Sequence, residues 1–532
     1  MKGRKIATVI ALSAALSLTP ALVGCSGDHY NSLDFDAQDT TYAVTSQGGS
    51  AVSYGNYIYF INGTRGYDDE DGAQNVWGDA VKGGICRAEL KGTKKDGTPA
   101  SFISEVDAKG IEFTYAETTD YFDEPINLVD VATIAPKTVG TSGYGSGGIF
   151  IYDNYVYFAS PNNSKNATGT VQTTRTDFFM MPLNGGTPTK IYTTAEDVDT
   201  SSSAYAFYKF DEAVFLVVNE GEDIISVKIN TKKSRPKIAD PVKFDVGATS
   251  VYFPVRDTYY EGIDNNTVED FIYFVRDVND DDTQRAGTVI EAMRPDGSEN
   301  FVVSMSGNTE TIEAVRDGVF FYRTTNNKNE TVLAYNSLHD ALLEQSPTYA
   351  ARQEELGSAG NRQVSGRFAT PVTSSITATY PFRPSLDSNT VYFIGVSSSS
   401  IDMYSMDGSV KNIVSTTGTI KFVNNNYLYC SDSSNGFFRV PLWPNMDGFG
   451  ETQSIATETK TATLDCDYAS GYFCYYGNID QWADGYTYFV RVDGIQGLDP
   501  ISVYLRSKAD TPTDKEIENA KNGDDTDGET TE

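Results

Sequence analysis

Three side chains with oxygen ligands alternate along Asp277-Val278-Asn279-Asp280-Asp281-Asp282. Asp277, Asn279 and Asp281 match the opening positions of a calcium-binding loop, which supplies oxygens from alternate residues. The match ends at the sixth position, Asp282, where such a loop needs glycine, and at the twelfth, Thr288, where it needs a bidentate glutamate. Two interpretations follow: a calcium site, and a solvated acidic loop between two strands.

Two of the five cysteines suggest a crosslink. Cys466 and Cys474 flank the sequence Ala469-Ser470-Gly471, and a three-residue loop there would place them opposite each other on a hairpin. Opposed strand residues have Cβ atoms about 4.5 to 5.5 Å apart, and a disulfide needs about 3.5 to 4.5 Å. A disulfide and a pair of small buried side chains are equally consistent with this pattern. The sequence has no Cys-x-x-Cys motif.

Few residues could serve in catalysis by histidine, because the chain has only two histidines, His29 and His339. A Ser-His-Asp triad would have to use His339, which lies in a predicted short helix, and no Gly-x-Ser-x-Gly motif accompanies it. We expect His339 to be a solvent-facing helix residue. With 73 acidic residues, carboxylate pairs for glycosidic chemistry cannot be singled out. The sequence therefore predicts a protein that is not an enzyme.

The N-terminus has the pattern of an export signal. A basic start precedes the apolar stretch Ile6–Leu18, which is too short to span a bilayer. Leu22-Val23-Gly24-Cys25 resembles the lipobox of bacterial lipoproteins, which implies cleavage before Cys25 and a diacylglyceryl group on its sulfur. The alternative is an ordinary signal peptide. The resemblance implies a location on the outer face of the cytoplasmic membrane, or on the outer-membrane or periplasmic side in a diderm cell.

The rest of the chain divides by composition. Residues 1–24 form the predicted lipoprotein signal peptide, and residues 25–48 the lipidated cysteine with a polar, flexible tether. Residues 49–508 form the folded body. Residues 509–532 hold nine acidic residues and two lysines and are predicted to be a disordered tail.

The folded body repeats one hairpin, in which a few alternating residues, a turn of Asn, Asp or Gly, and an aromatic strand follow one another. Turns of this composition suit φ > 0 and connect two antiparallel strands. The clearest copies are Val52–Phe60, Ile149–Phe158, Glu313–Tyr322, Lys421–Cys430 and Cys466–Tyr475, and weaker ones are Tyr208–Val217, Glu269–Phe274 and Leu386–Phe393. A second strand running into a glycine turn follows most copies, as in "AMRPDGS" at Ala292.

These repeats predict an all-β fold, a single β-propeller of four-stranded antiparallel blades. Eight hairpins favour eight blades, with seven as the alternative, because some 90 residues separate the first two hairpins. Strands are predicted at Tyr486–Val492 and Ile501–Arg506, with no obvious outer partner. We expect Thr41–Thr45 to pair there and close the ring, since closure removes an exposed sheet edge.

The units "GNYIYFIN", "DNYVYFAS" and "YSMDGS" resemble bacterial propeller repeats of unknown function, similar to the YWTD propeller of low-density-lipoprotein-receptor-related proteins. The likeness covers about half of the body and lacks the YWTD tetrad itself. It implies a propeller that binds ligands outside the cytoplasm, with no reaction attached. No functional residue carries over, because the matching positions are structural.

The net charge and the aromatic residues limit the classes of molecule that this protein is expected to bind. The formal net charge of −32 excludes a nucleic-acid role, which needs a positive patch for phosphates. Aromatic residues within the repeats are expected to fill the spaces between blades. Those predicted to lie in loops are better candidates for ligand contact; they include Trp77, Tyr121, Trp443 and Trp482.

Three functions remain open from the sequence. The first is a membrane-anchored binding module for an extracellular protein, peptide or glycan. The second is a scaffold or assembly factor of the envelope, and the third is an exported carboxylate-dependent hydrolase. No cofactor is established, and calcium is the one that the sequence suggests.

Overall fold

The computed structural model describes residues 43–505 of the 532-residue chain. Gaps of one to three residues interrupt the description at several places. The longer gaps are residues 62–75, 92–110, 115–126, 136–147, 163–174, 196–204, 261–266, 279–286, 357–362, 443–448, 457–465, 477–486 and 492–500.

The described residues form mainly antiparallel strands, and eight of their sheets have four or more strands. We number these sheets in chain order. The first contains β19 (Thr258–Tyr260), β1 (Ala43–Thr45), β2 (Ala51–Tyr54), β3 (Tyr57–Ile61), β6 (Ile85–Lys91) and β8 (Asn127–Ala135). The second contains β9 (Phe150–Tyr152), β10 (Tyr155–Pro161), β11 (Thr176–Pro182) and β12 (Thr189–Thr193). The third contains β13 (Tyr205–Phe210), β14 (Ala213–Glu220), β15 (Asp223–Asn230), β16 (Lys237–Ile238) and β17 (Val242–Asp245).

The remaining sheets continue this order. The fourth contains β18 (Ala248–Tyr252), β20 (Ile272–Val278), β21 (Gly287–Met293) and β22 (Phe301–Ser306), and the fifth β23 (Thr311–Arg316), β24 (Val319–Thr325), β25 (Thr331–Asn336) and β26 (Ser365–Pro371). The sixth contains β27 (Ala378–Phe382), β28 (Tyr392–Val396), β29 (Ile401–Ser405) and β30 (Val410–Val414), and the seventh β31 (Thr419–Asn424), β32 (Tyr427–Asp432), β33 (Gly436–Pro441) and β34 (Gln453–Ala456). The eighth contains β35 (Cys466–Ala469), β36 (Tyr472–Tyr476), β37 (Thr487–Arg491), β38 (Ile501–Leu505) and β7 (Ile111–Thr114), while β4 (Val76–Trp77) pairs only with β5 (Ala80–Val81).

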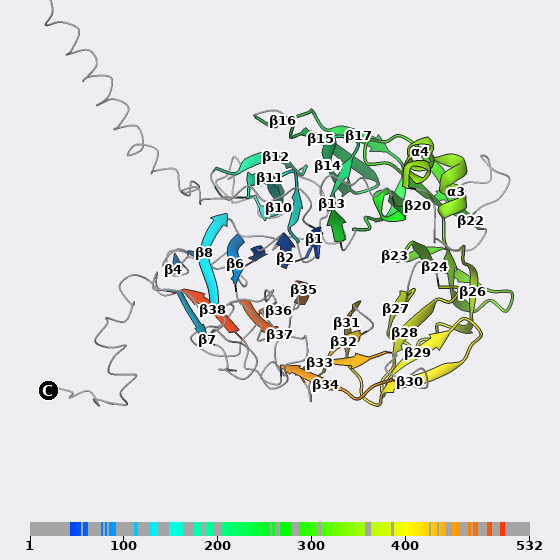
Figure 1. Cartoon of the computed structure of the whole chain (residues 1–532). Helices are drawn as coiled ribbons and strands as arrows, with labels where there is room; N and C mark the ends of the chain where they lie inside the picture. The colour runs from blue at the N-terminus through cyan, green and yellow to red at the C-terminus, as the bar shows by residue number, and fades with distance from the viewer. Residues whose placement is uncertain are drawn as a thin grey trace, which may run out of the picture.

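The sheets succeed one another around a ring, with the first strand of each sheet toward the middle (Figure 1). Within each sheet, most strands pair with their neighbours in the chain, so the fold is a series of local meanders. This is a propeller-like architecture. It confirms the predicted class of four-stranded antiparallel sheets.

The hairpin turns explain the repeated sequence. Asp153 and Asn154, between β9 and β10, have φ of 52° and 64°, and Asp317 and Gly318, between β23 and β24, have φ of 55° and 71°. Two consecutive residues with positive φ form the turn whose twist matches that of the flanking strands. Asp, Asn and Gly tolerate this conformation best, which is why they recur at these positions.

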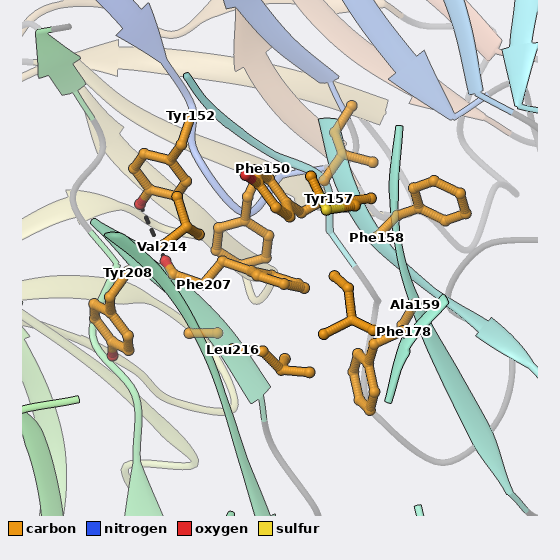
Figure 2. Packing of buried hydrophobic residues seen from close by; sticks show 14 of the residues in the cluster. Phe150, Tyr152, Tyr157, Phe158, Ala159, Phe178, Phe207, Tyr208, Val214 and Leu216 are labelled. Atoms are coloured by element: carbon orange, nitrogen blue, oxygen red, sulfur yellow. Dashed lines mark hydrogen bonds between the residues drawn. The ribbon is translucent and has the colours of Figure 1, made fainter. Parts of the chain in front are cut away.

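Aromatic side chains fill the space between successive sheets. Phe207 of the third sheet packs on Phe150 and Tyr157 of the second, with ring centroids 5.4 and 5.0 Å apart (Figure 2). The Tyr152 hydroxyl donates to the Phe207 carbonyl at 3.0 Å, so its polar end is satisfied inside this layer. Burial of each such ring contributes about 2 kcal/mol. The predicted structural use of the repeat aromatics is therefore confirmed for these sheets.

The expected ring closure by Thr41–Thr45 is wrong. β1 pairs with β2 and β19, and the strand beside β38 is β7. Only residues 46–50 separate β1 from β2, so local pairing costs little loop entropy. The segment between the first two hairpins accounts for β7: it supplies β6 and β8 to the first sheet and β7 to the eighth.

The predicted opposition of Cys466 and Cys474 is also wrong. The register pairs Cys466 with Tyr475 and Asp467 with Cys474. Ala469 pairs with Tyr472, so the loop is one residue shorter than expected and the register moves by one. Because a shift of one residue moves a position to the other face of a strand, the basis for the disulfide is removed. Among the cysteines whose side chains are described, Cys430 is buried and free.

One connection joins two distant sheets. Between β18 and β20, the chain leaves the fourth sheet and forms β19, which pairs with β1 of the first sheet. On its way, the Pro254 carbonyl accepts a hydrogen bond of 2.7 Å from the Tyr208 hydroxyl of the third sheet. We call the described residues of this connection, 253–255 and 258–260, the strap. The strap links the fourth, third and first sheets on their inner side.

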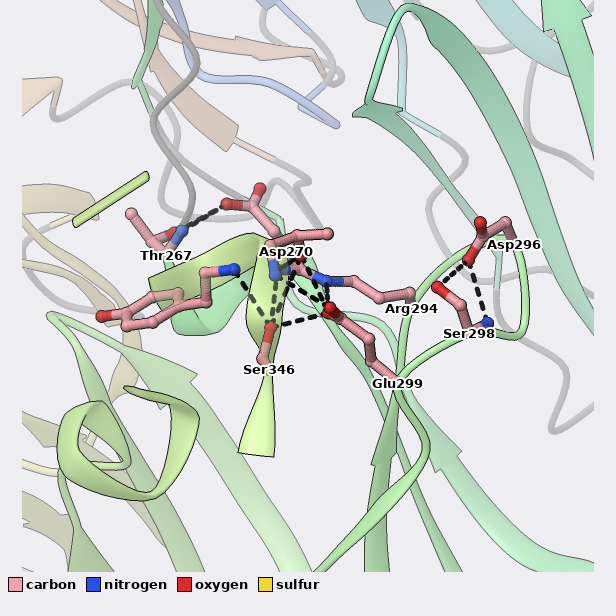
Figure 3. Close-up of polar contacts among 9 residues, drawn as sticks. Thr267, Asp270, Arg294, Asp296, Ser298, Glu299 and Ser346 are labelled. Carbon is pink, nitrogen blue, oxygen red and sulfur yellow. Dashed lines mark hydrogen bonds and ion pairs between the residues drawn. The ribbon is translucent and has the colours of Figure 1, made fainter. Parts of the chain in front are cut away.

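Two short helices pack beside the fourth sheet through a buried arginine. α3 (His339–Gln345) and α4 (Pro347–Leu356) lie between β25 and β26, and neither is long and apolar enough to cross a membrane. Arg294 is fully buried, with its guanidinium 3.7 Å from the centroid of the Phe271 ring. Its Nε donates to Glu299 at 2.8 Å (Figure 3). Its Nη2 donates to Thr348 at 2.8 Å. Ser346, between the helices, donates to the same Glu299 at 2.6 Å.

We predict that Arg294→Met lowers the free energy of unfolding by about 3 to 5 kcal/mol. The change leaves Glu299 without its cation, and breaking a buried pair from one side has this typical cost. Urea unfolding followed by tryptophan fluorescence measures the loss. Lys232→Met is the control, because Lys232 and Glu212 are 55% and 69% exposed in their ion pair and such pairs contribute at most about 1 kcal/mol. Equal losses in the two variants would contradict the assignment.

Candidate functional site

The candidate site lies where the first strands of three successive sheets end. Arg316, the last residue of β23, has its guanidinium carbon 3.8 Å from the centroid of the Tyr380 ring on β27. It also hydrogen-bonds the Tyr252 side chain at the end of β18. One side chain of the fifth sheet therefore contacts both neighbouring sheets. All three strands end on the face where first strands turn toward second strands, which we call the inner-turn face.

Two carboxylates accompany this arginine, and both accept backbone hydrogen bonds from a neighbouring sheet. Asp317 Oδ2 accepts the Arg383 N–H at 3.1 Å, just after β27. Glu269 Oε1, in the 3-10 helix η2 (Val268–Asp270) before β20, accepts the Gly318 N–H at 3.1 Å. Glu269 is nearly buried, whereas Asp317 is exposed at its turn. We refer to Tyr252, Glu269, Arg316, Asp317, Tyr380 and Arg383 as the inner-turn cluster.

The electrostatics of the cluster centre on Asp317. Although the residue reaches solvent, protein atoms crowd its carboxyl group, and this desolvation raises the pKa of Asp317 to about 6. The Arg383 N–H and the Arg316 charge oppose the rise, while the Glu269 charge adds to it. A carboxyl group with such a pKa changes its charge in the mildly acidic range.

The same turn position joins sheets elsewhere in the ring. The Asp153 carboxylate, at the inner turn of the second sheet, binds Lys209 Nζ and accepts the Thr231 hydroxyl at 2.5 Å, both from the third sheet. The Tyr54 hydroxyl of the first sheet donates to Asn154 at 3.3 Å. Side chains at these inner turns thus bind one sheet to the next. In the inner-turn cluster, the residue with this role, Asp317, is also exposed and follows an arginine that contacts two tyrosines.

Several residues singled out from the sequence lie elsewhere. Asp277 is exposed in β20, opposite Thr288, and Trp77 lies in β4. The described residues contain no group of three potential metal ligands, and calcium stays a prediction. The predicted positions that lie outside the described residues are Cys25, Tyr121, Asn279, Asp281, Trp443 and Trp482.

His339 differs from its expectation. The residue begins helix α3 as predicted, but it is 7% exposed, with Nδ1 2.7 Å from the Tyr349 hydroxyl. The helix packs its first turn inward, because Leu342 on the same face is fully buried in the same layer of side chains. His339 therefore holds α3 against α4.

Sequence reasoning missed the whole inner-turn cluster. Its members are 131 residues apart at most in the chain, between Tyr252 and Arg383, and belong to three sheets. The only local signal was the Asp-Gly turn at Asp317, which also occurs at turns with other roles. The Arg316 preceding that turn would have been the distinguishing feature.

Comparison with known proteins gives the chain no family. It matches no described protein family and no curated protein. Among solved structures, the WD40 domain of SCAP from fission yeast is similar at 8% identity over 90% of this chain and 96% of that one, with a TM-score of 0.35. The β-propeller domain of the Trilobed protease from Pyrococcus furiosus gives 10% identity over 70% and 92%, with a TM-score of 0.32. An oligogalacturonate lyase in complex with manganese gives 9% identity over 64% and 86%, with a TM-score of 0.34.

We predict that Asp317→Asn stabilises the protein at pH 7.5. A raised pKa means that the folded protein binds this proton more tightly than the unfolded chain, so wild-type stability falls as the pH rises from about 4 to about 6. Asparagine keeps an acceptor for the Arg383 N–H and carries no charge. Thermal unfolding should show a rise on the order of 1 to 2 °C at pH 7.5 and none at pH 4.

The matched control is Asp211→Asn, at the inner turn between β13 and β14 of the third sheet. A gain that is the same at pH 4 and pH 7.5 would show that the charge of Asp317 is not its cause.

Proposed function

We propose that this chain is a membrane-anchored extracytoplasmic lipoprotein whose β-propeller is a binding module for an extracellular protein, peptide or glycan. The observation that carries the proposal is the inner-turn cluster. Asp317 is exposed, and its carboxylate is fixed in place by a backbone N–H of the next sheet. A polar group held by the scaffold before any ligand arrives loses little entropy on binding, which favours recognition.

The surroundings of Asp317 suit a polar ligand. Arg316, which contacts the Tyr380 ring and the Tyr252 side chain, supplies a positive charge next to the turn, and Asp317 supplies an acceptor. Sites built on strands keep a more constant geometry than sites built on mobile loops. The net charge of −32 adds a preference for cationic or neutral ligands over anionic ones.

The finer architecture belongs to this proposal. We infer eight blades, because the described residues form eight sheets of four or more strands. We infer that the eighth blade is completed by β7, so that the N-terminal half of the chain supplies the strand that ends the last sheet. The envelope scaffold remains the alternative, in which the same face would bind another exported protein permanently.

A carboxylate-dependent hydrolase is supported by one specific observation. The pKa of Asp317, about 6, is in the range of a general acid, and Glu269 lies close enough to raise it. However, Glu269 is nearly buried and engaged with the Gly318 N–H. This arrangement favours a structural role for Glu269 over a role in bond cleavage.

The ligand proposal predicts that Asp317→Lys weakens binding at least tenfold. The test screens the fluorescent wild-type protein on an array of cell-wall oligosaccharides and on a library of cationic peptides. Titration of the retained probe then compares the wild type with Asp317→Lys and with the control Glu222→Lys, on the turn at the other end of β14. Equal affinity in all three proteins would place the binding site elsewhere, and a probe cleaved by the wild type but not by Asp317→Asn would favour the hydrolase.

The anchor proposal predicts that Cys25→Ser moves the protein from the membrane fraction to the soluble fraction. The lipid is attached through the sulfur, so serine cannot carry it, and two or more acyl chains are needed for durable anchoring. Metabolic labelling with a radioactive fatty acid and cell fractionation measure the change. Labelling that persists in Cys25→Ser would overturn the assignment of the lipid to Cys25.

A further inference from the structure

Positive charge gathers at one edge of this acidic protein. Residues 228–243 contain six lysines and arginines and one acidic residue, Asp240, although acidic residues outnumber basic ones by 73 to 41 in the whole chain. The segment forms the end of β15 and the strands β16 and β17, at the outer rim of the third sheet (Figure 1). Five of the six basic residues lie in the described chain and are exposed: Lys228, Lys232, Arg235, Lys237 and Lys243. We call these five residues the basic edge.

Three members of the basic edge are not neutralised by the rest of the described chain. Lys232 and Lys243 form ion pairs with acidic residues of the same sheet. Within the part of the chain that the structure describes, Lys228, Arg235 and Lys237 have no ion pair, and all three are exposed. A surface cation without a carboxylate partner is available to an external anion, because no internal pair has to be broken first.

Lys228 and Lys237 project from the same face of the third sheet. Lys237 is opposite Asn230, and Lys228 is two residues before Asn230 on β15. Opposed residues and alternate residues share a face, and diagonal neighbours of this kind are about 7 to 8 Å apart. Farther along the same face, the Ser226 hydroxyl donates to the Pro295 carbonyl, in the turn after β21, at 2.5 Å. The fourth sheet therefore covers this face near Ser226 and leaves it open where the two lysines lie.

Protection of a sheet edge accounts for only part of this charge. Outer strands often carry lysine and proline, which keep them from pairing with other chains, and Pro236 and Pro241 flank β16 in this way. The outer strands of the other sheets carry at most one basic residue each, such as Arg367 in β26 and Lys411 in β30. In the third sheet, β16 and β17 carry two, and three more lie beside them. This surplus indicates an external ligand.

We propose that the basic edge binds a linear polymer of phosphate groups. The kind of partner follows from the charge of the rest of the protein. A second copy of this chain or another acidic protein would bring its own carboxylates against a chain of net charge −32, and an anionic bilayer would repel the chain over a wide area. A thin polymer can contact the basic edge alone, because charges farther away than about 8 Å are screened at physiological salt.

The chemistry of the basic edge suits closely spaced phosphates. Each phosphate that pairs with a lysine or arginine releases condensed counterions, and this gain in entropy favours polymers of high charge density. Arg235 can offer two parallel N–H groups to one phosphate, and the lysines act as point charges. We expect a polymer without bases, because the ring beside Lys228, that of Phe215, is buried and cannot stack on them. This site is separate from the inner-turn cluster and does not depend on the lipid anchor.

The experiment measures how fluorescein-labelled inorganic polyphosphate binds to the full-length protein in a neutral detergent. Fluorescence anisotropy gives the association constant at a series of salt concentrations. The triple variant Lys228→Gln, Arg235→Gln and Lys237→Gln should bind roughly tenfold more weakly or worse, because it loses three phosphate contacts. Each lost contact lowers the slope of log K against log salt by about 0.7, so the slope should fall by about 2. Unchanged melting temperatures ensure that folded proteins are compared.

The matched control removes the same charge elsewhere. Lys328→Gln, Arg367→Gln and Lys411→Gln change exposed residues of the fifth and sixth sheets, and this triple variant should bind polyphosphate as the wild type does. Equal losses in the two triple variants would assign the effect to net charge and overturn the proposal. A wild type that does not bind polyphosphate at low salt would also overturn it. Phosphatidylglycerol vesicles provide the last comparison: if they bind the wild type through the basic edge and polyphosphate does not compete, the partner is a bilayer and the polymer is wrong.

Discussion

The layer of apolar side chains between successive sheets is the contact on which the rest of this protein depends. A four-stranded sheet cannot bury both of its faces by itself, and here the second and third sheets pack on each other through rings such as Phe150, Tyr157 and Phe207. This contact fixes where first strands end relative to each other. The hydrogen bonds of the inner turns become strong only because the layer excludes water and holds both partners still. The polar cluster is therefore a consequence of apolar packing.

The side chains at the inner turns add directional hydrogen bonds and ion pairs to this apolar packing. Apolar layers tolerate small shifts, whereas the hydrogen bond from the Arg383 N–H to the Asp317 carboxylate requires a defined distance and direction. Asp153 does the same with a lysine and a hydroxyl. At Arg294, a buried cation plays the same part for the helices, since its Nε donates to Glu299 and its Nη2 to Ser346 and Thr348. Ionisable groups thus select one arrangement among several that apolar contacts alone would permit.

The sequence predicted the parts of this fold that are local and failed where distant segments meet. The hairpins at Ile149–Phe158 and Glu313–Tyr322 were predictable, because turn residues with positive φ and alternating aromatics lie within ten residues of each other. The partner of β38 was not, because an edge strand accepts any extended segment that reaches it, and nothing local identifies β7. The predicted register of Cys466 was wrong because the hairpin loop is one residue shorter than expected. The candidate site could not be predicted for the same reason as the pairing of β7. Tyr252, Arg316 and Tyr380 meet only after three sheets have packed.

The pairings of β1 and β7 also impose an order of events on the nascent chain. β1 is made more than 200 residues before its partner β19, and β7 almost 400 residues before β38. The middle sheets have only local partners and can form as soon as their strands exist, whereas the first sheet must wait for β19, in the middle of the chain, and β7 must wait for β38, near its end. Long waits of this kind slow folding and leave strand edges open to wrong partners. The eighth sheet should therefore be the last to complete, since it needs both β7 and the late strands β35 to β38.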